Sequence, residues 1–399
     1  MRAGRRTIRG RSFGAARWAI LREPTARVFG SVPSQLLAIA TGALSSLSPG
    51  ASPITLHGQR DLRPAVVARG LGHPTNLAFD SHRGIWATSA TGYPTPTNGV
   101  WYVRAAGARP VHVVHGLKTA LGLVWRGREL YVASVTVPGR TGAVTAYSKF
   151  DGSRFHRRRV VVRNLPVGLH NLDSIVPGPG GRLYLGVGSR SDHTRSPQRL
   201  SGTVISFKLD GSGLRVEARG LRNPYGLAFV PGTSDLLVTD NGRDDLGLFA
   251  PPDEINLVRV GRRPRSFGFP GCYGQGGRAC RGAMPPLVRL VPHAAAGAIA
   301  VVPRLGRFGL SAYVAQNGSS FAGEPTGNDV IRVSLSRRRS GGYTVKAHPF
   351  ATGFEDHDPL AVALGPDGRL YLGLFSSNAL IRVAPERLRG FRPSGGSTG

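Results

Sequence analysis

The chain has 399 residues, with 56 glycines, 30 prolines and a formal charge of +30. Hardly any window repeats its apolar residues at helical spacing over three turns, whereas many Val, Leu and Tyr stand in alternating runs. No segment reaches the ~18 consecutive apolar residues that a membrane-spanning helix needs. The composition therefore favours an all-β protein and excludes a helical membrane protein.

The positive charge is typical of proteins that bind nucleic acid or an acidic membrane surface. Only four of the 52 basic residues are lysines, and the arginines are scattered along the chain apart from short runs at 157–159 and 337–339. The preference for arginine over lysine, spread over the whole chain, is more typical of codon usage in the genome than of a binding face. Since the motifs that carry base or phosphate contacts are also missing, we expect no nucleic-acid partner.

The first 30 residues carry eight arginines and no lysine, and a short apolar run, 36–44, follows before several small residues. A charged region, an apolar region and small residues together are typical of an export signal, although this charged part is long. A disordered basic arm is the alternative. We expect residues 1–52 to form one or the other, and residues 390–399 to be a disordered tail.

The rest of the chain repeats one pattern: Gly-Leu, a polar stretch, an apolar strand, a turn, and a second strand with Trp or Tyr. Copies that open with Gly-Leu start at residues 70, 116, 168 and 220; a weaker copy starts near residue 293, and a clear one that opens with Gly-Phe starts at residue 353. The starts are roughly 50 residues apart, and the fourth copy is the longest. Each copy reads as a short antiparallel meander with Gly-containing turns. The repeat predicts a six-bladed β-propeller of four-stranded antiparallel blades over residues 53–389, with a strand from 53–70 closing the ring.

The two cysteines, Cys272 and Cys280, stand in a Gly-rich loop of the fourth copy. Their spacing is too long for a CxxC metal pair, and two further ligands would be needed. We expect a local disulfide, with free thiols as the alternative, and hence an oxidising compartment. The predicted location is secreted, periplasmic or on the cell surface.

In such a ring the residues that follow each Gly-Leu meet at one mouth of the central channel. These positions are polar, unlike their apolar neighbours. They are Gly72, His73, Lys118, His170, Arg222, Asn223, Asp356, His357 and Asp358.

Several phrases of the sequence resemble the soluble PQQ-dependent sugar dehydrogenases, the glucose/sorbosone dehydrogenase family of six-bladed propellers. The phrases are GLRNPYGLAF, DNGRDD with PDEINLV and SFGFPGCYG, HAAAG, EPTGNDVIRV and LAVALGPDGRLYLG, and the resemblance covers about residues 65–385. It implies an oxidoreductase that oxidises the C1 hydroxyl or aldehyde carbon of a sugar, with PQQ and Ca²⁺ as cofactors and an external electron acceptor.

The resemblance also implies roles for particular residues. His170 matches the histidine that takes a proton from the sugar hydroxyl, a role that suits a neutral imidazole. Arg222 and Asn223 match the pair that contacts the quinone, and Lys118 stands on the cofactor side of the second blade. The backbone carbonyls that hold Ca²⁺ map to Gly242 and Arg243.

Other positions depart from the family pattern. Leu117 stands where a glutamine is usual, Ser189 where an aspartate is common, and Asn317 and Ala322 where many members have His and Arg. A lost charge-assisted contact to the cofactor costs about 2 kcal/mol or more. Two alternatives therefore stay open. One is a non-catalytic extracellular propeller that has lost the cofactor, and the other is a propeller lactonase, for which only Asp173 and Asp358 offer inward acids.

Overall fold

The computed structural model describes residues 56–58, 62–319, 322–323, 325–355 and 358–385, and all of them belong to one compact unit, 33–399. The segments 1–52 and 390–399, for which the sequence predicts an export signal or basic arm and a tail, lie outside the described residues. Asp356 and His357 also lie outside them. No helix within the described residues is long and apolar enough to cross a membrane.

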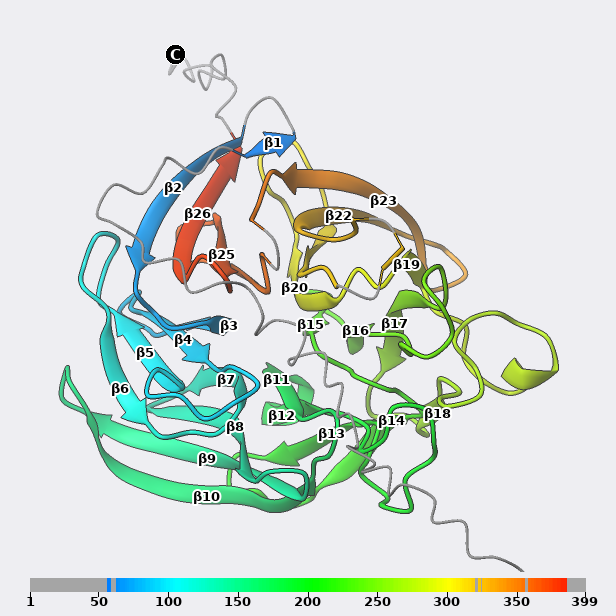
Figure 1. Cartoon of the computed structure of the whole chain (residues 1–399), viewed down its shortest axis with the longest axis horizontal. Helices are drawn as coiled ribbons and strands as arrows, with labels where there is room; N and C mark the ends of the chain where they lie inside the picture. Colours follow the sequence, from blue (N-terminus) through cyan, green and yellow to red (C-terminus); the bar gives the residue numbers. More distant parts are fainter. Residues whose placement is uncertain (1–55, 59–61, 320–321, 324, 356–357, 386–399) are drawn as a thin grey trace, which may run out of the picture. The chain divides into compact units, whose positions relative to one another are not determined.

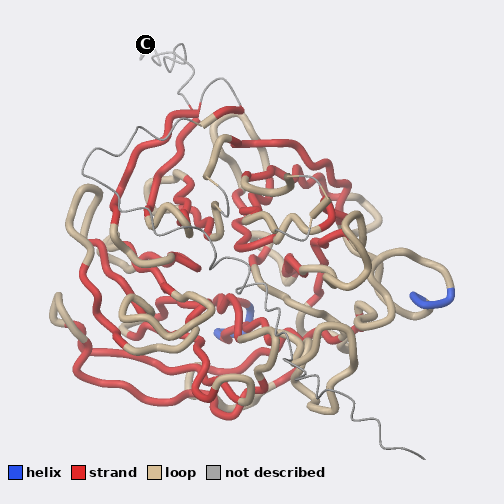
Figure 2. Tube along the Cα trace, viewed as in Figure 1, coloured by secondary structure: helices blue, strands red, loops and turns tan. Residues whose placement is uncertain are grey.

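The described strands form six sheets that surround a central channel (Figure 1), and Figure 2 shows how little helix accompanies them. Each sheet is a meander of four antiparallel strands, with its first strand innermost, and two sheets carry a fifth strand. The prediction of a six-bladed β-propeller is confirmed. We call the sheets blades and number them in chain order.

The first three blades come from the first half of the chain. Blade 1 contains β3 (Pro74–Phe79), β4 (Ile85–Ser89), β5 (Gly99–Val103) and β6 (Val111–His115). Blade 2 contains β7 (Ala120–Arg126), β8 (Glu129–Val137), β9 (Thr141–Phe150) and β10 (Phe155–Pro166). Blade 3 contains β11 (Leu172–Gly178), the 3₁₀ turn η1 (Pro179–Gly181), β12 (Arg182–Val187), β13 (Thr203–Lys208) and β14 (Arg215–Arg219).

The last three blades follow in the same order. Blade 4 contains β15 (Leu227–Phe229), β16 (Asp235–Asp240), β17 (Pro252–Arg259) and β19 (Val288–Pro292). Between its last two strands the chain forms β18 (Arg265–Ser266), which pairs in parallel with β14, and η2 (Arg278–Cys280). Blade 5 contains β20 (Ala296–Val302), β21 (Ser311–Gln316), β22 (Asp329–Arg337) and β23 (Tyr343–Thr352), and blade 6 contains β24 (Ala361–Leu364), β25 (Leu370–Leu374) and β26 (Ala379–Pro385).

The ring is closed by strands from the start of the described chain. The outermost strand of blade 6 is β2 (Leu62–Arg69), which pairs antiparallel with β26, and β1 (His57–Gly58) adds to β23 of blade 5. Closure by β2 removes the free edge that β26 would otherwise present. The strand predicted between residues 53 and 70 is therefore confirmed.

Glycines allow the innermost strands to approach each other closely around the channel. A Cβ atom at Gly122 in β7 would lie 2.2 Å from the Asp173 carbonyl oxygen of β11, and one at Gly297 in β20 would lie 2.5 Å from the Leu360 carbonyl oxygen. Such distances are far below van der Waals contact, so only glycine fits at these two positions. The glycines inside the repeated apolar strands are thus required by ring closure.

The core lies between neighbouring blades, where apolar side chains of facing sheets interdigitate. Between blades 1 and 2, Trp86 is fully buried and its ring contacts those of Tyr102, Trp125 and Phe150 at centroid distances of 4.5–5.1 Å. Its indole N–H donates to the Asp80 carboxylate at 2.8 Å. Trp86 thereby fixes both the packing of the two blades and the first turn of blade 1.

The channel is filled with side chains just below its mouth. A buried apolar cluster joins Ala90, Leu121, Tyr225, Leu360 and Phe375, which come from four different blades or the links between them. The Tyr225 hydroxyl donates to the Thr75 carbonyl oxygen at 3.1 Å and so connects the start of blade 4 to blade 1. This cluster forms a floor on which the polar residues of the mouth rest.

Candidate functional site at the channel mouth

His170 lies at the mouth immediately before the innermost strand of blade 3. Its side chain is buried, and its Nε2 atom has no hydrogen-bond partner in the described structure. The backbone N–H of His170 donates to the Ser189 carbonyl oxygen, and a Cβ atom at Gly188 would come within 2.4 Å of the His170 Cβ. The second strand of the blade thus places this imidazole and leaves one ring nitrogen available.

The pKa of His170 lies well below its usual value, because burial disfavours the charged form and the nearby Arg222 guanidinium adds repulsion. The imidazole is therefore neutral at pH 7. A neutral imidazole with an unpartnered Nε2 is equipped to accept a proton.

Arg222 and Asn223 stand beside His170, as the repeat predicts. The backbone N–H of Ser189 donates to the Arg222 carbonyl oxygen at 2.7 Å, so one residue of blade 3 bridges His170 and Arg222. The backbone N–H groups of Arg222 and Asn223 donate to the Asp240 carboxylate at 2.7–3.3 Å. The end of β16 therefore holds the start of blade 4 at the mouth.

The Arg222 guanidinium is buried and bonded on all sides. It makes ion pairs with Asp192 of blade 3 and with Asp244, the latter at 2.7 Å, and donates to the Asn241 carbonyl oxygen at 3.3 Å. Asp244 in turn lies 3.6 Å from the His293 ring, and this contact is the main reason that the pKa of His293 is raised. Arg222 is thus part of an ionic network that joins three segments of the mouth.

A pocket opens on the other side of Arg222, between blade 4 and the loop that carries the cysteines. Gly242, Arg243, Asp240 and Glu254 contribute to its wall, together with Phe267, Phe269, Cys272 and Tyr273. The Gly242 N–H donates to the Asp253 carboxylate at 2.8 Å, and Arg243 pairs with Asp245 and donates to the Pro270 carbonyl oxygen. The turn of Gly242 and Arg243, to which the resemblance assigns calcium, therefore contributes to the lining of this pocket.

Two carboxyl groups face this pocket from neighbouring strands. Asp240 and Glu254 are direct partners in the register of β16 and β17, and Oε1 of Glu254 has no hydrogen-bond partner. Burial is the main cause that raises the pKa of Asp240 to about 8 and that of Glu254 to about 7, and their like charges add to it for Asp240. The pocket thus holds one carboxyl oxygen, Oε1 of Glu254, that has no hydrogen-bond partner among the described residues.

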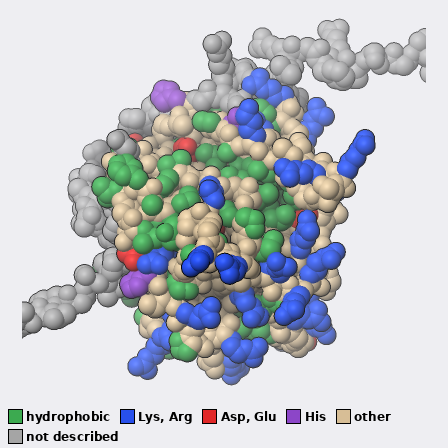
Figure 3. All heavy atoms as spheres, turned by 90° about the vertical axis from the view of Figure 1, so that its right-hand side faces the viewer, with side chains coloured by type: hydrophobic (Ala, Val, Ile, Leu, Met, Phe, Trp, Pro, Cys, Tyr) green, Lys and Arg blue, Asp and Glu red, His purple; other side chains and the backbone are tan. Residues whose placement is uncertain are grey.

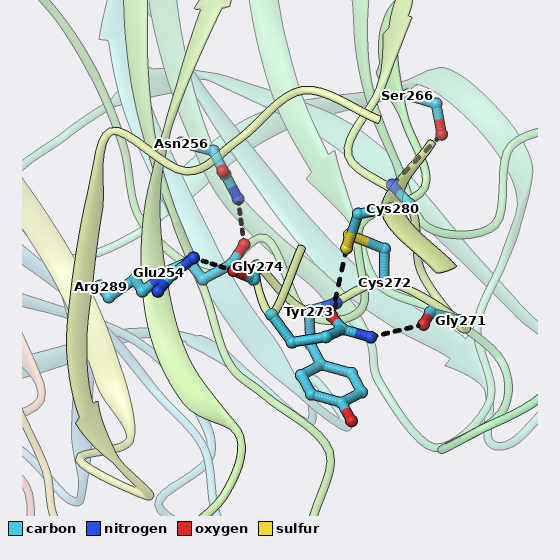
Figure 4. The surroundings of a disulfide bond; sticks show 11 residues. Glu254, Asn256, Ser266, Gly271, Cys272, Tyr273, Gly274, Cys280 and Arg289 are labelled. Carbon is cyan, nitrogen blue, oxygen red and sulfur yellow. Dashed lines mark hydrogen bonds between the residues drawn. A yellow bond between two sulfur atoms is a disulfide. The ribbon is translucent and has the colours of Figure 1, made fainter. Parts of the chain in front are cut away.

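The loop bearing the cysteines covers Glu254 (Figure 4). Cys272 and Cys280 form a disulfide, as predicted, and the Arg289 guanidinium donates to the Gly274 carbonyl oxygen. A Cβ atom at Gly274 would lie 2.7 Å from Oε1 of Glu254, and its φ of +76° also favours glycine. The disulfide therefore holds a loop that closes the pocket directly over the Glu254 carboxyl group.

Removing the disulfide should destabilise the protein. The bond closes a loop with a sequence separation of 8, which corresponds to about 2–3 kcal/mol of chain entropy in the unfolded state. We expect the free energy of unfolding of the Cys272→Ala/Cys280→Ala variant, measured with urea, to be lower than that of the parent protein by that amount. A reducing agent should shift the parent toward the variant and leave the variant unchanged. Identical curves for oxidised and reduced parent would contradict the expectation.

The structure does not bring all the predicted residues together. Lys118 is exposed, and among the described contacts no side-chain bond joins it to blade 4; its carbonyl oxygen accepts from Asn98 at 3.1 Å. Asp358 is buried, but its carboxylate accepts from the backbone N–H groups of Ser376 and Ser377 and so orders a turn of blade 6. The contribution of Lys118 to the site remains a prediction.

Sequence reasoning missed two acidic residues. Asp192 pairs with Arg222, but it lies in an irregular loop of blade 3, outside the repeated pattern. The repeat therefore does not predict this ion pair. Asp173 was considered only as a lactonase ligand, yet it is fully buried, both its oxygens lack partners, and burial and the neighbouring Asp240 raise its pKa well above the usual value. A charged residue inside a repeated apolar strand was the signal that could have identified Asp173.

Comparisons with known proteins agree with this architecture. No protein-family model matches the chain. One curated relative, an uncharacterized protein of Borreliella burgdorferi, is 31% identical over 100 residues, which is 25% of this chain and 26% of the relative. The match thus spans only about a quarter of that protein.

Solved structures match over most of the chain. The calcium structure of a Trichoderma reesei carbohydrate-active enzyme of family AA12 has a TM-score of 0.70 at 16% identity and covers 84% of this chain and 98% of its own. The holo PQQ domain of the Coprinopsis cinerea pyranose dehydrogenase has a TM-score of 0.68 at 18% identity, with coverages of 84% and 99%.

A third match is the PQQ-bound aldose sugar dehydrogenase of Streptomyces coelicolor, with a TM-score of 0.64 at 20% identity and coverages of 84% and 99%. This chain therefore has the same propeller fold as these three solved structures. The resemblance seen in the sequence phrases is confirmed at the level of the fold.

Proposed function

We propose that the protein is a quinoprotein oxidoreductase that oxidises the C1 hydroxyl or aldehyde carbon of a sugar at the channel mouth. The observation that carries the proposal is the buried, neutral His170 with its unpartnered Nε2 beside the Arg222–Asn223 segment. The shared fold with PQQ-bound sugar dehydrogenases supports it. An external electron acceptor completes the reaction.

His170 acts as the general base. Its Nε2 accepts the proton of the sugar hydroxyl, and its low pKa keeps that nitrogen unprotonated over the neutral range. Bound PQQ supplies the acceptor for the hydride. The buried floor beneath the mouth, with Tyr225 and Phe375, keeps the reacting atoms away from bulk water.

The quinone fits the mouth through Arg222, Asn223 and Lys118. The exposed ammonium of Lys118 is suited to a carboxylate of the cofactor, which carries three. The Arg222 guanidinium already bonds Asp192 and Asp244, so it reaches a cofactor carboxylate only by exchanging one of these partners. We therefore expect the quinone to bind more weakly than in a site with a free arginine.

Calcium fits the pocket behind Arg222. The backbone carbonyls of Gly242 and Arg243 and the carboxyl groups of Asp240 and Glu254 are hard oxygen donors on one wall, which is the ligand type that Ca²⁺ takes. A cation bound here would give Oε1 of Glu254 a partner and would stabilise the ionised form of both carboxyl groups. Without a cation, that oxygen has no partner and the pKa of both groups is raised. Calcium there lies next to the proposed quinone site.

The raised pKa values predict a pH dependence of stability. The folded protein retains protons on Asp240 and Glu254 that the unfolded chain releases, so their contribution is full below about pH 4 and is lost as pH rises through about 7–8. We expect the unfolding temperature of the metal-free protein to fall over this interval. Because Ca²⁺ binds the ionised groups, the stabilisation by Ca²⁺ should grow over the same interval.

Thermal unfolding in EGTA and in CaCl₂ across this pH range measures both effects. The Glu254→Gln variant is the control, since it removes one titrating group and one ligand but keeps the shape. Stabilisation by calcium that does not change with pH, or that is equal in the variant, would rule out this pocket.

The turnover test combines purified protein, PQQ and Ca²⁺ with a panel of aldoses and an artificial dye as acceptor. Dye reduction that requires both PQQ and sugar supports the proposal. Quinone binding without dye reduction over the whole panel would contradict the sugar substrate, and a lack of quinone binding would contradict the proposal itself.

A second candidate is a non-catalytic extracellular propeller. The ion pairs of Arg222 with Asp192 and Asp244 favour this second candidate, since in a protein that no longer binds a quinone the guanidinium would pair with acidic residues of the chain itself. Both candidates place the protein in an oxidising compartment, which the disulfide supports. Titration with PQQ distinguishes them.

A further inference from the structure

Some of the arginines that look scattered in the sequence share one end of the propeller. The innermost strands start side by side at the mouth, where Thr75 bonds the Ala120 carbonyl oxygen and Ala298 the Leu360 carbonyl oxygen. In every blade the antiparallel meander therefore sends its first and third turns to the opposite end. We call this opposite end, formed by the turns after the first and third strands, the far end.

Exposed basic residues occupy far-end turns around the ring. The turn after β5 carries Arg104 and Arg109 in blade 1, and the turn after β7 carries Arg126 and Arg128 in blade 2. Arg304 follows β20 in blade 5. Positions far apart in the sequence thus share one surface because the repeat places them there.

Blades 4 and 5 carry the densest part of this surface. Arg262 and Arg263 follow β17, and Arg338 and Arg339 lie in the hairpin between β22 and β23; all four are exposed. The two segments are neighbours, since the Arg259 guanidinium lies against this hairpin. Figure 3 shows the molecule from its rim, so that the far end is seen edge-on; Lys and Arg side chains lie over much of the right-hand and lower parts of this view, with few acidic side chains between them.

Among the described residues, the acidic side chains of the far-end turns form no ion pair with Arg262, Arg263, Arg338 or Arg339. Asp80 accepts from the N–H groups of its own turn and from Trp86. Asp151 accepts from the backbone of its own turn, and Glu129 pairs with Arg159. Among the described residues no ion pair engages Arg262 or Arg263.

We propose that the far end is a docking surface for an anionic phospholipid bilayer. The basic positions are spread over several blades around the ring, which matches a plane of phosphate groups rather than a single track along one element. Each basic side chain near an anionic bilayer strengthens binding by about fivefold. Leu214, exposed in the turn after β13 next to Arg215, adds an apolar contact to the interface.

Docking in this way directs the channel mouth, with His170, away from the lipid. Soluble substrates then reach the mouth from the side opposite the bilayer. The inference does not depend on the proposed oxidation, because it uses residues at the other end of the propeller.

Co-sedimentation with vesicles tests the docking surface. The full chain should bind vesicles of phosphatidylcholine with phosphatidylglycerol but not phosphatidylcholine alone, and salt should weaken the binding steeply. The variant R262E/R263E/R338E/R339E should lose about 600-fold or more in partitioning, about fivefold for each of the four positions. The matched control is R195E/R199E/R278E/R281E, which changes the net charge equally. Its four positions lie in the mouth loop of blade 3 and in the cysteine loop, so it should lose far less partitioning to the vesicles.

Unfolding temperatures of both variants, measured in parallel, verify that each is folded. Equal losses in the two variants would overturn the inference, since net charge alone would then explain the binding. Tighter binding to double-stranded DNA than to the anionic vesicles, with the same dependence on the far-end residues, would also overturn it and assign the surface to nucleic acid.

Discussion

Replacing His170 by alanine is expected to lower kcat for sugar oxidation by about 10²–10⁴-fold, the range that a positioned general base contributes. The reason is that its unpartnered Nε2 is the proposed proton acceptor at the mouth. Quinone affinity and the unfolding temperature should change little, because the imidazole makes no side-chain hydrogen bond through that nitrogen. Steady-state dye reduction and quinone titration of the same preparation measure the two quantities.

The His170→Gln variant is a control for packing, since glutamine retains much of the volume but is not a base. It should be as slow as the alanine variant. If either variant keeps the parental kcat, His170 has no part in the mechanism.

Replacing Arg222 by methionine is expected to destabilise the protein by about 3–5 kcal/mol, the usual cost of removing one partner of a buried ion pair. The side chain is 2% exposed, and its removal takes the guanidinium partner away from both Asp192 and Asp244. Urea unfolding followed by linear extrapolation gives the change in free energy.

The triple variant R222M/D192N/D244N separates this cause from simple loss of packing. Neutral amides no longer need the guanidinium, so most of the lost stability should return. A triple variant as unstable as the single one would show that the ionic network is not the source of the effect.

The fold could be predicted from the sequence because the propeller repeats its signals. Each Gly-Leu before an apolar strand marks the entry to a blade, and the length of residues 53–70 before the first copy predicts the closing strand that β2 provides. The pairing of Cys272 with Cys280 followed from their short spacing.

The site could be predicted only in part. His170, Arg222 and Asn223 meet because they occupy equivalent positions of neighbouring copies, which a repeat alignment shows directly. The partners of Arg222 are different: Asp192 lies in an irregular loop, and nothing in its sequence context indicates a long-range ion pair.

The distribution of charge shows the same limit. Arginines that are scattered in the sequence share the far end only because alternate turns of every blade point that way. Basic residues that are scattered along the sequence of a repeat protein can therefore still share a binding face, because the repeat places alternate turns on one surface.

Oxidation of a sugar by a quinone bound beside His170 can be observed without any dye. The absorbance of PQQ bound to the protein with Ca²⁺ is followed under anaerobic conditions after an aldose is added. We expect the sugar to reduce the bound quinone, and the His170→Ala variant to bind the quinone but reduce it about 10²–10⁴-fold more slowly. A quinone that binds and stays oxidised with every aldose, or that is reduced equally fast in the variant, would contradict this expectation.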